Sequence, residues 1–370
     1  MDTDKRESYN GFRERGGRRY QSFALELVPG SRCQLRCLSC YKLGAAGSRL
    51  GDMPSSFVRR VLSEAETCGF AEAVFIGGEP TLHPALPELA RYARERGLTP
   101  IICTNGLRLS NPGYVDALAH PGTVLVVHAP LPDSAIQDRF AGVPGYADKL
   151  RRAYANIRGR DGIRIIAEIV VVEEFLAYIP DVYRWCLDNG ITPFIELNRR
   201  NDARMSYGNA CSPEEIERLF SELAGLDPHP PASLVPPAYG QPCTMSITGV
   251  HVKNLGGGDY GGVYSCCAQG VRHGDLTRET LAEVLSSPTF SVFRHQDSWI
   301  HGPCRTCPDY SVCRGGCRGE AYLTFGCPRA SSPVCWRLPA DVRSDPAVMA
   351  PKSCAGCPLL GNPACTPRCA

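Results

Sequence analysis

The sequence predicts an α/β fold in which a parallel sheet carries helices on its outer side, followed by a small cysteine-rich domain. Short β-branched runs alternate with amphipathic stretches from residue 23 to about 225, which gives six strand-then-helix units. A proline-rich segment at 227–237 can continue neither a helix nor a central strand. Glycine, cysteine and short segments dominate the rest of the chain. The sheet is expected to be open or curled into an incomplete barrel.

The expected elements alternate along the chain and several have clear boundaries. Pro54 and Ser55 stand at the start of the first helix, and Gly97 and Gly190 follow the ends of two others. Functional residues in such sheets lie at the carboxyl ends of the strands, where the loops converge. The expected strands are 23–28, 73–76, 100–103, 123–127, 163–172 and 192–197, and the expected helices are 55–68, 85–96, 114–120, 146–160, 175–189 and 213–224.

Composition excludes several classes of function. Of the 370 residues 43% are hydrophobic, enough for a sizeable core, and the formal net charge of +2 argues against broad binding to nucleic acid or acidic membranes. No apolar run has the length of a transmembrane helix. Residues 1–20 are polar and lack the apolar centre of an export signal, so we expect a tail on a cytoplasmic protein.

The chain contains twenty cysteines. Disulfides do not persist in a reducing compartment, so this number indicates metal binding. Most of the cysteines gather at 33–40 and from 243 to the end. The singletons Cys68, Cys103, Cys186 and Cys211 fall in otherwise regular segments and are expected to fill the core.

Cys33, Cys37 and Cys40 lie on one short loop directly after the first expected strand. Three thiolates can hold three irons of a four-iron cluster and leave the fourth iron open to a small molecule. A structural zinc loop is the alternative. It needs further ligands, and no cysteine or histidine follows until Cys68, which favours the open cluster.

A turn of sequence Gly77-Gly78-Glu79-Pro80 follows the second expected strand. Two glycines permit close approach of the backbone to a ligand, and the neighbouring carboxylate suits a cationic amine. Alone, such a turn is common. It becomes specific because it stands one strand after the three-cysteine loop.

These two motifs, Cys-x3-Cys-x2-Cys and Gly-Gly-Glu-Pro at the ends of successive strands, resemble the radical S-adenosylmethionine (SAM) enzymes. The resemblance covers residues 21–225 and implies a partial (β/α)6 barrel. It implies that the open iron binds the amino and carboxylate groups of SAM. An electron from the cluster then cleaves the sulfonium bond, and the resulting 5′-deoxyadenosyl radical takes a hydrogen atom from substrate.

By this resemblance Cys33, Cys37 and Cys40 hold the cluster, and the turn from Gly77 to Pro80 receives the amino group of SAM. Asn105 and Glu168, after the third strand and on the fifth, fall where the family lines its pocket.

The chain departs from the family pattern at two positions. Ser39 replaces an aromatic residue before the last cysteine, which changes the expected contact with adenine. His128 replaces a serine at the end of the fourth strand. It could bind the carboxylate or ribose of the cofactor, act on substrate, or have no role.

The cysteines of the second half resemble the SPASM extension found on radical SAM enzymes. The resemblance rests on Cys243, a Cys266-Cys267 pair shortly after two glycines, a Cys-x2-Cys-x5-Cys-x3-Cys block and a later Cys335. It implies two auxiliary four-iron clusters. The fourth ligand of the first cluster stays open between Cys267, another residue and substrate. The implied ligands are Cys243, Cys266 and Cys317 for the first cluster, and Cys304, Cys307, Cys313 and Cys335 for the second. We expect a linker at 226–242 and the SPASM domain at 243–338.

The last part of the chain lies outside this scheme. Residues 339–370 are expected to be a tether and a cysteine-rich tail. The tail holds Cys354, Cys357, Cys365 and Cys369, whose spacing suits a further iron–sulfur cluster or a zinc ion, although a disordered tail is the alternative.

The resemblance implies an oxidoreductase-type enzyme that receives electrons from a donor such as flavodoxin or ferredoxin. Two auxiliary clusters suit net oxidation. A thiol that returned a hydrogen atom would instead give an epimer, and Cys267 and Cys327 are the candidates.

The expected substrate is a peptide or protein side chain. Only about twenty residues precede the first strand, too few for a leader-peptide-binding domain. A small natural product such as an aminosugar, aminocyclitol or nucleoside is therefore the alternative. An iron–sulfur electron carrier is the non-enzymatic alternative, but a carrier needs neither the open cysteine loop nor the Gly-Gly-Glu-Pro turn.

Overall fold

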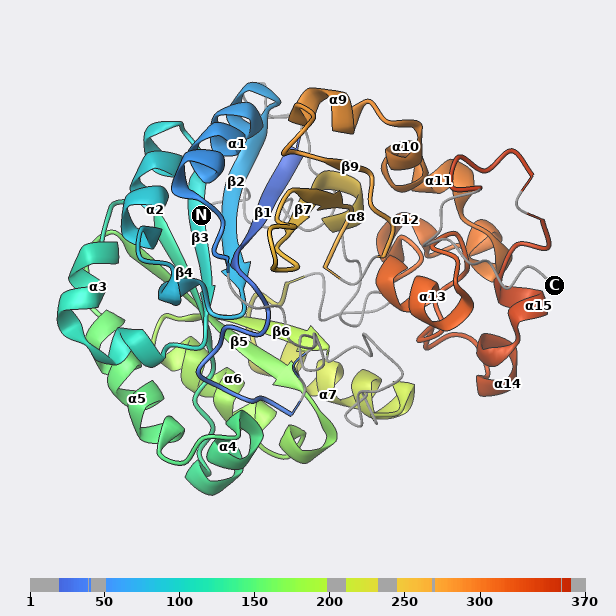
Figure 1. Ribbon diagram of the computed structural model, residues 1–370. Coiled ribbons are helices and arrows are strands. Elements are labelled where there is room, and N and C mark those ends of the chain that lie inside the picture. Colours follow the sequence, from blue (N-terminus) through green and yellow to red (C-terminus); the bar gives the residue numbers. More distant parts are fainter. Residues whose placement is uncertain are drawn as a thin grey trace.

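The computed structural model describes residues 20–38, 40, 51–197, 211–231, 245–267, 270–353 and 355–360. Its centre is a nine-stranded sheet with the strand order β6-β5-β4-β3-β2-β1-β7-β8-β9. Strands β1 to β6 pair in parallel, and the helices between them cover the outer side of the curved sheet (Figure 1). The order is linear, so the barrel stays open at β6, as predicted. The parallel strands are β1 (Tyr20–Val28), β2 (Phe70–Gly77), β3 (Thr99–Thr104), β4 (Thr123–His128), β5 (Ile163–Val171) and β6 (Thr192–Leu197).

The helices of the barrel include all six that the sequence predicts. The structure adds a further helix directly after β4, and short 3-10 turns after β2, β3 and β5, namely η2 (Pro80–Leu82), η3 (Leu107–Ser110) and η4 (Glu173–Phe175). The helices are α1 (Ser55–Thr67), α2 (Leu86–Glu95), α3 (Pro112–Leu118), α4 (Ser134–Ala141), α5 (Tyr146–Ile157), α6 (Ile179–Asp188) and α7 (Pro213–Leu226).

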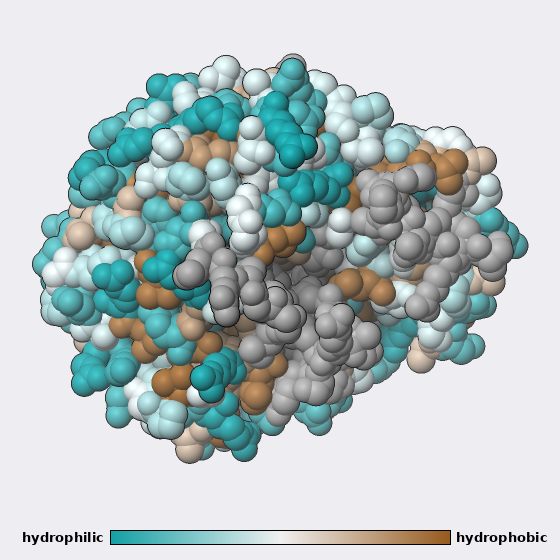
Figure 2. Space-filling view, viewed as in Figure 1, coloured by the Kyte–Doolittle hydropathy of each residue, from teal (hydrophilic) through white to brown (hydrophobic). Residues whose placement is uncertain are grey.

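Burial follows the sequence pattern. The last six residues of β1 are all buried, because helices and loops cover the sheet there on both faces. Helix α1 buries Phe57, Val58, Val61, Leu62 and Ala65, which recur at helical spacing on one side. Figure 2 shows hydrophilic side chains over much of the outer face of α1 and α2. The core therefore lies between the sheet and its layer of helices.

The sheet continues from the barrel into the second half of the chain. Strand β7 (Val250–Lys253) pairs in parallel with β1, and β8 (Gly262–Tyr264) and β9 (Gly274–Asp275) follow antiparallel. The buried carboxylate of Glu26 on β1 lies 2.7 Å from His251 Nε2 and also accepts a hydrogen bond from the backbone N–H of Asn254. The domain boundaries stay predictions, but this sheet joins the two halves across the expected linker.

The rest of the second half is built of short helices that form a lobe beside the barrel (orange to red in Figure 1). Some apolar residues of the second half, among them Val250, Leu281 and Phe290, pack into the core of the barrel, and two small clusters hold others, among them Phe293 and Phe325. The expected tether contains two helices and buries Met349 and Ala350. The helices described in the second half are α8 (Met245–Thr248), α9 (Leu281–Leu285), α10 (Pro288–Arg294), α11 (Gln296–Trp299), the 3-10 turn η5 (Gly302–Thr306), α12 (Tyr310–Cys313), α13 (Arg318–Phe325), α14 (Ala340–Ser344) and α15 (Pro346–Met349). Within the described residues, none of the helices combines the length and the apolar character needed to cross a membrane.

Candidate active site and cluster sites

The three-cysteine loop follows β1 at the carboxyl edge of the sheet, as predicted. Burial, and then the charges of Cys40 and Cys33, raise the pKa of Cys37 to about 12. The three thiols are therefore close enough to interact, and Cys37 stays protonated at neutral pH without metal. Iron supplies the positive charge that ionises such thiols, so this donor set fits a cluster whose binding releases protons.

The two glycines of the Gly-Gly-Glu-Pro turn bring the end of β2 against the cysteine loop. A Cβ atom on Gly78 would lie 2.3 Å from the carbonyl oxygen of Arg32, and one on Gly77 would lie 2.5 Å from that of Val28. The backbone N–H of Glu79 donates to the same Arg32 oxygen, at 3.0 Å. The sequence predicted that these glycines let the backbone approach a ligand. Their first role in the structure is to join the two motifs.

Replacement of Gly78 by alanine should therefore force the two motifs apart. We expect a destabilisation of about 1–3 kcal/mol, as for overpacking, together with a loss of iron from the first cluster. Gly225→Ala in α7 is the control, because nothing lies within 4 Å of the added atom and its backbone is unstrained. Thermal unfolding and iron content measure both effects. Equal behaviour of the two variants would contradict the close fit at Gly78.

The side chain of Glu79 is 1% exposed and accepts four hydrogen bonds from the protein itself. Oε1 accepts from the backbone N–H and hydroxyl of Thr81 and from the hydroxyl of Thr104, the two hydroxyls at 2.6 Å. Oε2 accepts from the backbone N–H of Asn105 at 2.8 Å. The carboxylate therefore ties the turn after β2 to the turn after β3. A contact between this carboxylate and the amino group of SAM stays a prediction.

Asn105 connects the Glu79 carboxylate to the first cluster ligand, Cys33. Its Nδ2 lies 3.6 Å from the sulfur of Cys33 and 3.2 Å from Oε1 of Gln34. Burial raises the pKa of Cys33, while the backbone N–H of Leu35 and the amide of Asn105 lower it. Asn105 therefore stabilises the thiolate form that binds iron.

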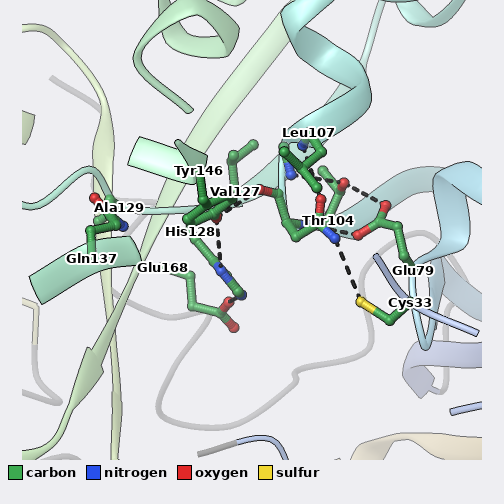
Figure 3. A network of polar contacts seen from close by, with 12 residues as sticks. Cys33, Glu79, Thr104, Leu107, Val127, His128, Ala129, Gln137, Tyr146 and Glu168 are labelled. Carbon is green, nitrogen blue, oxygen red and sulfur yellow. Dashed lines mark hydrogen bonds and ion pairs between the residues drawn. The ribbon is translucent and has the colours of Figure 1, made fainter. Parts of the chain in front are cut away.

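His128, the last residue of β4, lies beside Glu168 of the neighbouring strand β5, as Figure 3 shows. The imidazole Nε2 lies 3.3 Å from Oε2 of Glu168, and Nδ1 lies 3.2 Å from the hydroxyl of Tyr146. The Tyr146 hydroxyl donates to the carbonyl oxygen of Asn105, at 2.8 Å. The structure thus places three predicted pocket residues in one network. It also adds Tyr146, which the sequence predicted only as part of a helix.

The ring of His128 is held in a largely buried setting. Burial lowers its pKa, while the carboxylates of Glu79 and Glu196 raise it. A neutral imidazole with its proton on Nε2 can donate to the Glu168 carboxylate, and its Nδ1 then faces the Tyr146 hydroxyl. Contacts of His128 with the cofactor or with substrate stay predictions.

Four cysteines of the second half line a single small cavity together with Tyr310 and Trp336. Burial, followed by the charges of Cys304 and Cys335, raises the pKa of Cys313 to about 11. The donor set is thus four interacting thiols in one enclosed place, which suits a closed four-iron cluster. The cysteines are Cys304, Cys307, Cys313 and Cys335, the set that the SPASM resemblance assigns to the second auxiliary cluster.

The other predicted ligands are only partly described. Cys266 and Cys317 are buried, whereas Cys243 lies outside the described residues. In the tail, Cys354, Cys365 and Cys369 also lie outside the described residues, and Cys357 packs in a small apolar cluster. Metal binding by the tail stays a prediction.

The two thiols considered as hydrogen donors differ in access. Cys327 is 2% exposed, and Cys267 is exposed. A role of either thiol as hydrogen donor stays a prediction.

Comparisons with known proteins place this geometry in a family. Residues 27–186 match the family model of the radical SAM superfamily, and residues 259–308 match SPASM, described as an iron-sulfur cluster-binding domain. The chain is a radical SAM enzyme with a SPASM domain. It therefore binds [4Fe–4S] clusters and SAM, and the predicted fold and cofactors are confirmed. The assignment of individual ligands stays a prediction.

Relatives of this radical SAM enzyme match it over most of its length. The PqqA peptide cyclase of Xanthomonas oryzae pv. oryzae (strain MAFF 311018) is 28% identical over 341 residues, covering 87% of this chain and 89% of that protein. The PqqA peptide cyclase of Ruegeria pomeroyi is 28% identical over 325 residues, covering 83% and 85%.

Two solved structures share the fold of this radical SAM enzyme. Native anSMEcpe with bound AdoMet superimposes with a TM-score of 0.66 at 16% identity, covering 85% of this chain and 93% of that one. Streptococcus suis SuiB bound to S-adenosylmethionine gives 0.67 at 16% identity, covering 87% and 78%.

Proposed function

We propose that this radical SAM enzyme oxidatively modifies a side chain of a peptide or protein. The observation that carries the proposal is the near full-length match to relatives named PqqA peptide cyclase. SuiB, whose fold this chain shares, has also been solved with its precursor peptide SuiA, with a TM-score of 0.67 at 17% identity over 87% of this chain and 76% of that one. The four-cysteine cavity adds a place to receive electrons, as oxidation requires.

The chain's own residues divide the work between the two halves. The cluster and SAM, when bound, supply the radical that removes a hydrogen atom from substrate. Cys33, Cys37 and Cys40 would hold that cluster at the carboxyl edge of the sheet, and Glu79 and Asn105 fix the loops around it. Rigid placement matters because radical chemistry depends on the distance between the reacting atoms.

Net oxidation also releases a proton and an electron from the substrate. His128 and Glu168 are titratable side chains on neighbouring strands, linked to Asn105 through Tyr146, and a released proton can be held there. Cys304, Cys307, Cys313 and Cys335 would hold an electron acceptor within the same polypeptide. A reduced flavodoxin or ferredoxin is the proposed external donor for cleavage of SAM.

The proposal is tested with the reconstituted, reduced enzyme, SAM and candidate substrates. Peptides encoded beside the gene form one arm, and aminosugars, aminocyclitols and nucleosides form the other. We expect 5′-deoxyadenosine together with a peptide whose mass has fallen by two hydrogen atoms. Turnover of a small molecule with every peptide unchanged would contradict the proposal. An unchanged mass with an inverted residue would indicate epimerisation instead.

A further inference from the structure

Arg318 is a cation buried among the cysteines of the second half. It follows Cys317 directly, begins helix α13 and is 3% exposed. Its Nη1 donates to the carbonyl oxygens of Pro328 and Ala330, at 3.1 and 2.5 Å, and its Nη2 donates to that of Gly315. Three backbone carbonyls from two loops therefore hold the guanidinium in place.

The positive charge of this guanidinium is not matched by an acid. Within the described part of the chain its hydrogen-bond acceptors are neutral carbonyl oxygens, and no carboxylate forms an ion pair with it. Its Nε–H is buried and finds no acceptor among those residues. A buried cation without a counter-charge costs several kcal/mol, so its retention calls for an anionic neighbour.

The cysteines supply that neighbour. Cys317 directly precedes Arg318 in the chain. Gly315, whose carbonyl oxygen accepts from Nη2 of Arg318, lines the same cavity as Cys304 and Cys313. Burial lowers the pKa of Arg318, whereas the charges of these three thiols accordingly raise it. Cys317 belongs to the predicted first auxiliary site, and the other two belong to the second. One cation therefore acts on ligands of both sites.

The turn before Arg318 adds further positive character beside the sulfur of Cys313. Arg314, Gly315 and Gly316 have φ values of 54°, 74° and 69°, in the left-handed region. This conformation turns the N–H groups of the two glycines toward Cys313, and their hydrogen bonds lower the pKa of that thiol. Because a Cβ on Gly315 would lie only 3.2 Å from Nη2 of Arg318, the same turn also leaves room for the guanidinium.

We propose that Arg318 raises the reduction potential of the auxiliary clusters, chiefly the one held by Cys304, Cys307, Cys313 and Cys335. One-electron reduction adds a negative charge to a site already surrounded by thiolates. A fixed cation nearby favours the reduced state, and the effect is large because the guanidinium is shielded from water. The use of this electron sink for substrate oxidation rests on the proposed function, but the potential itself does not.

Redox titration of the reconstituted full-length enzyme, followed by electron paramagnetic resonance without substrate, tests the proposal. We expect Arg318→Gln to make reduction of the second auxiliary cluster at least tenfold less favourable, a drop of about 59 mV for one electron. Arg318→Lys keeps the charge on a shorter side chain with fewer hydrogen bonds, so a smaller drop is expected.

Arg305→Gln is the matched control. Arg305 stands between Cys304 and Cys307 in sequence, but its side chain is exposed to water. The same charge is removed, and solvent screening should keep the shift well below that of Arg318→Gln. Equal shifts in the two variants would overturn the proposal, because the buried position would then carry no special effect.

Iron content, measured first, shows which clusters each variant keeps. If Arg318→Gln loses the second auxiliary cluster, the potential of the first auxiliary cluster is measured instead, because its predicted ligand Cys317 precedes Arg318 in the chain. An unchanged potential of that first auxiliary cluster overturns the proposal. If Arg318→Gln holds neither cluster, Arg318→Lys decides. A drop well below tenfold supports the proposal, whereas a full tenfold drop with the positive charge retained overturns it. Failure of the enzyme to modify any peptide would contradict the proposed function and would leave these potentials unaffected.

Discussion

We expect the triple alanine variant of Cys33, Cys37 and Cys40 to form no 5′-deoxyadenosine while it keeps the iron of its second half. The three thiols interact with one another on the loop after β1, whereas the four-cysteine cavity of the second half lies in a separate lobe. Removing the loop ligands should therefore lower the iron content from about twelve to about eight per chain, the content of three and two four-iron clusters. Iron analysis and chromatographic assay of 5′-deoxyadenosine measure the two effects.

A single Cys186→Ala variant is the control for this experiment. Cys186 is fully buried in helix α6 and packs in the main core. Its removal should cost some stability but leave iron content and SAM cleavage near the wild-type values. Cleavage retained by the triple variant would refute the assignment of the loop. A loss of all iron would mean that the second half cannot hold its clusters alone.

The order of strands and helices could be predicted because it depends on local patterns. Helix α4 was missed for a local reason. Its buried residues are only Gln137, Phe140 and Ala141, so the sequence shows a weak apolar side. Gln137 is buried because it bonds the backbone of Ala129 and Leu131, a contact that no periodicity reveals.

The site could be predicted as far as its motifs extend. The cysteine motifs and the resemblance that they support predict the ligand sets. The places of Asn105 after the third strand, His128 at the end of the fourth and Glu168 on the fifth could be predicted in the same way. The hydroxyl of Tyr146 escaped notice because its partners lie 41 and 18 residues away. The joining of the two halves was missed in the same way, since His251 and Glu26 are 225 residues apart.

The second large effect is expected from Glu79→Ala. This substitution leaves the backbone N–H groups of Thr81 and Asn105 and the hydroxyls of Thr81 and Thr104 without their shared acceptor inside the protein. Each unsatisfied buried group costs about 1–3 kcal/mol, and partial relaxation recovers some of this, so a loss of at least about 3 kcal/mol is expected. Thermal unfolding of the reconstituted enzyme measures the stability. Glu88→Ala removes an exposed carboxylate from α2 and should cost less than about 1 kcal/mol. A similar melting temperature for both variants would contradict the stabilising role of the four hydrogen bonds that Glu79 accepts.

Glu79→Gln distinguishes the structural role of the Glu79 carboxylate from a direct contact of that carboxylate with SAM. Glutamine keeps one oxygen for the Thr81 and Thr104 donors but turns its NH2 group toward the N–H of Asn105, so the turn after β3 should shift. Because Asn105 also reaches Cys33, this shift is expected to lower both stability and the yield of 5′-deoxyadenosine per bound cluster. A weaker affinity for SAM with unchanged stability would have a different meaning. It would indicate that the carboxylate itself binds the amino group, because only loss of its negative charge could then explain the result.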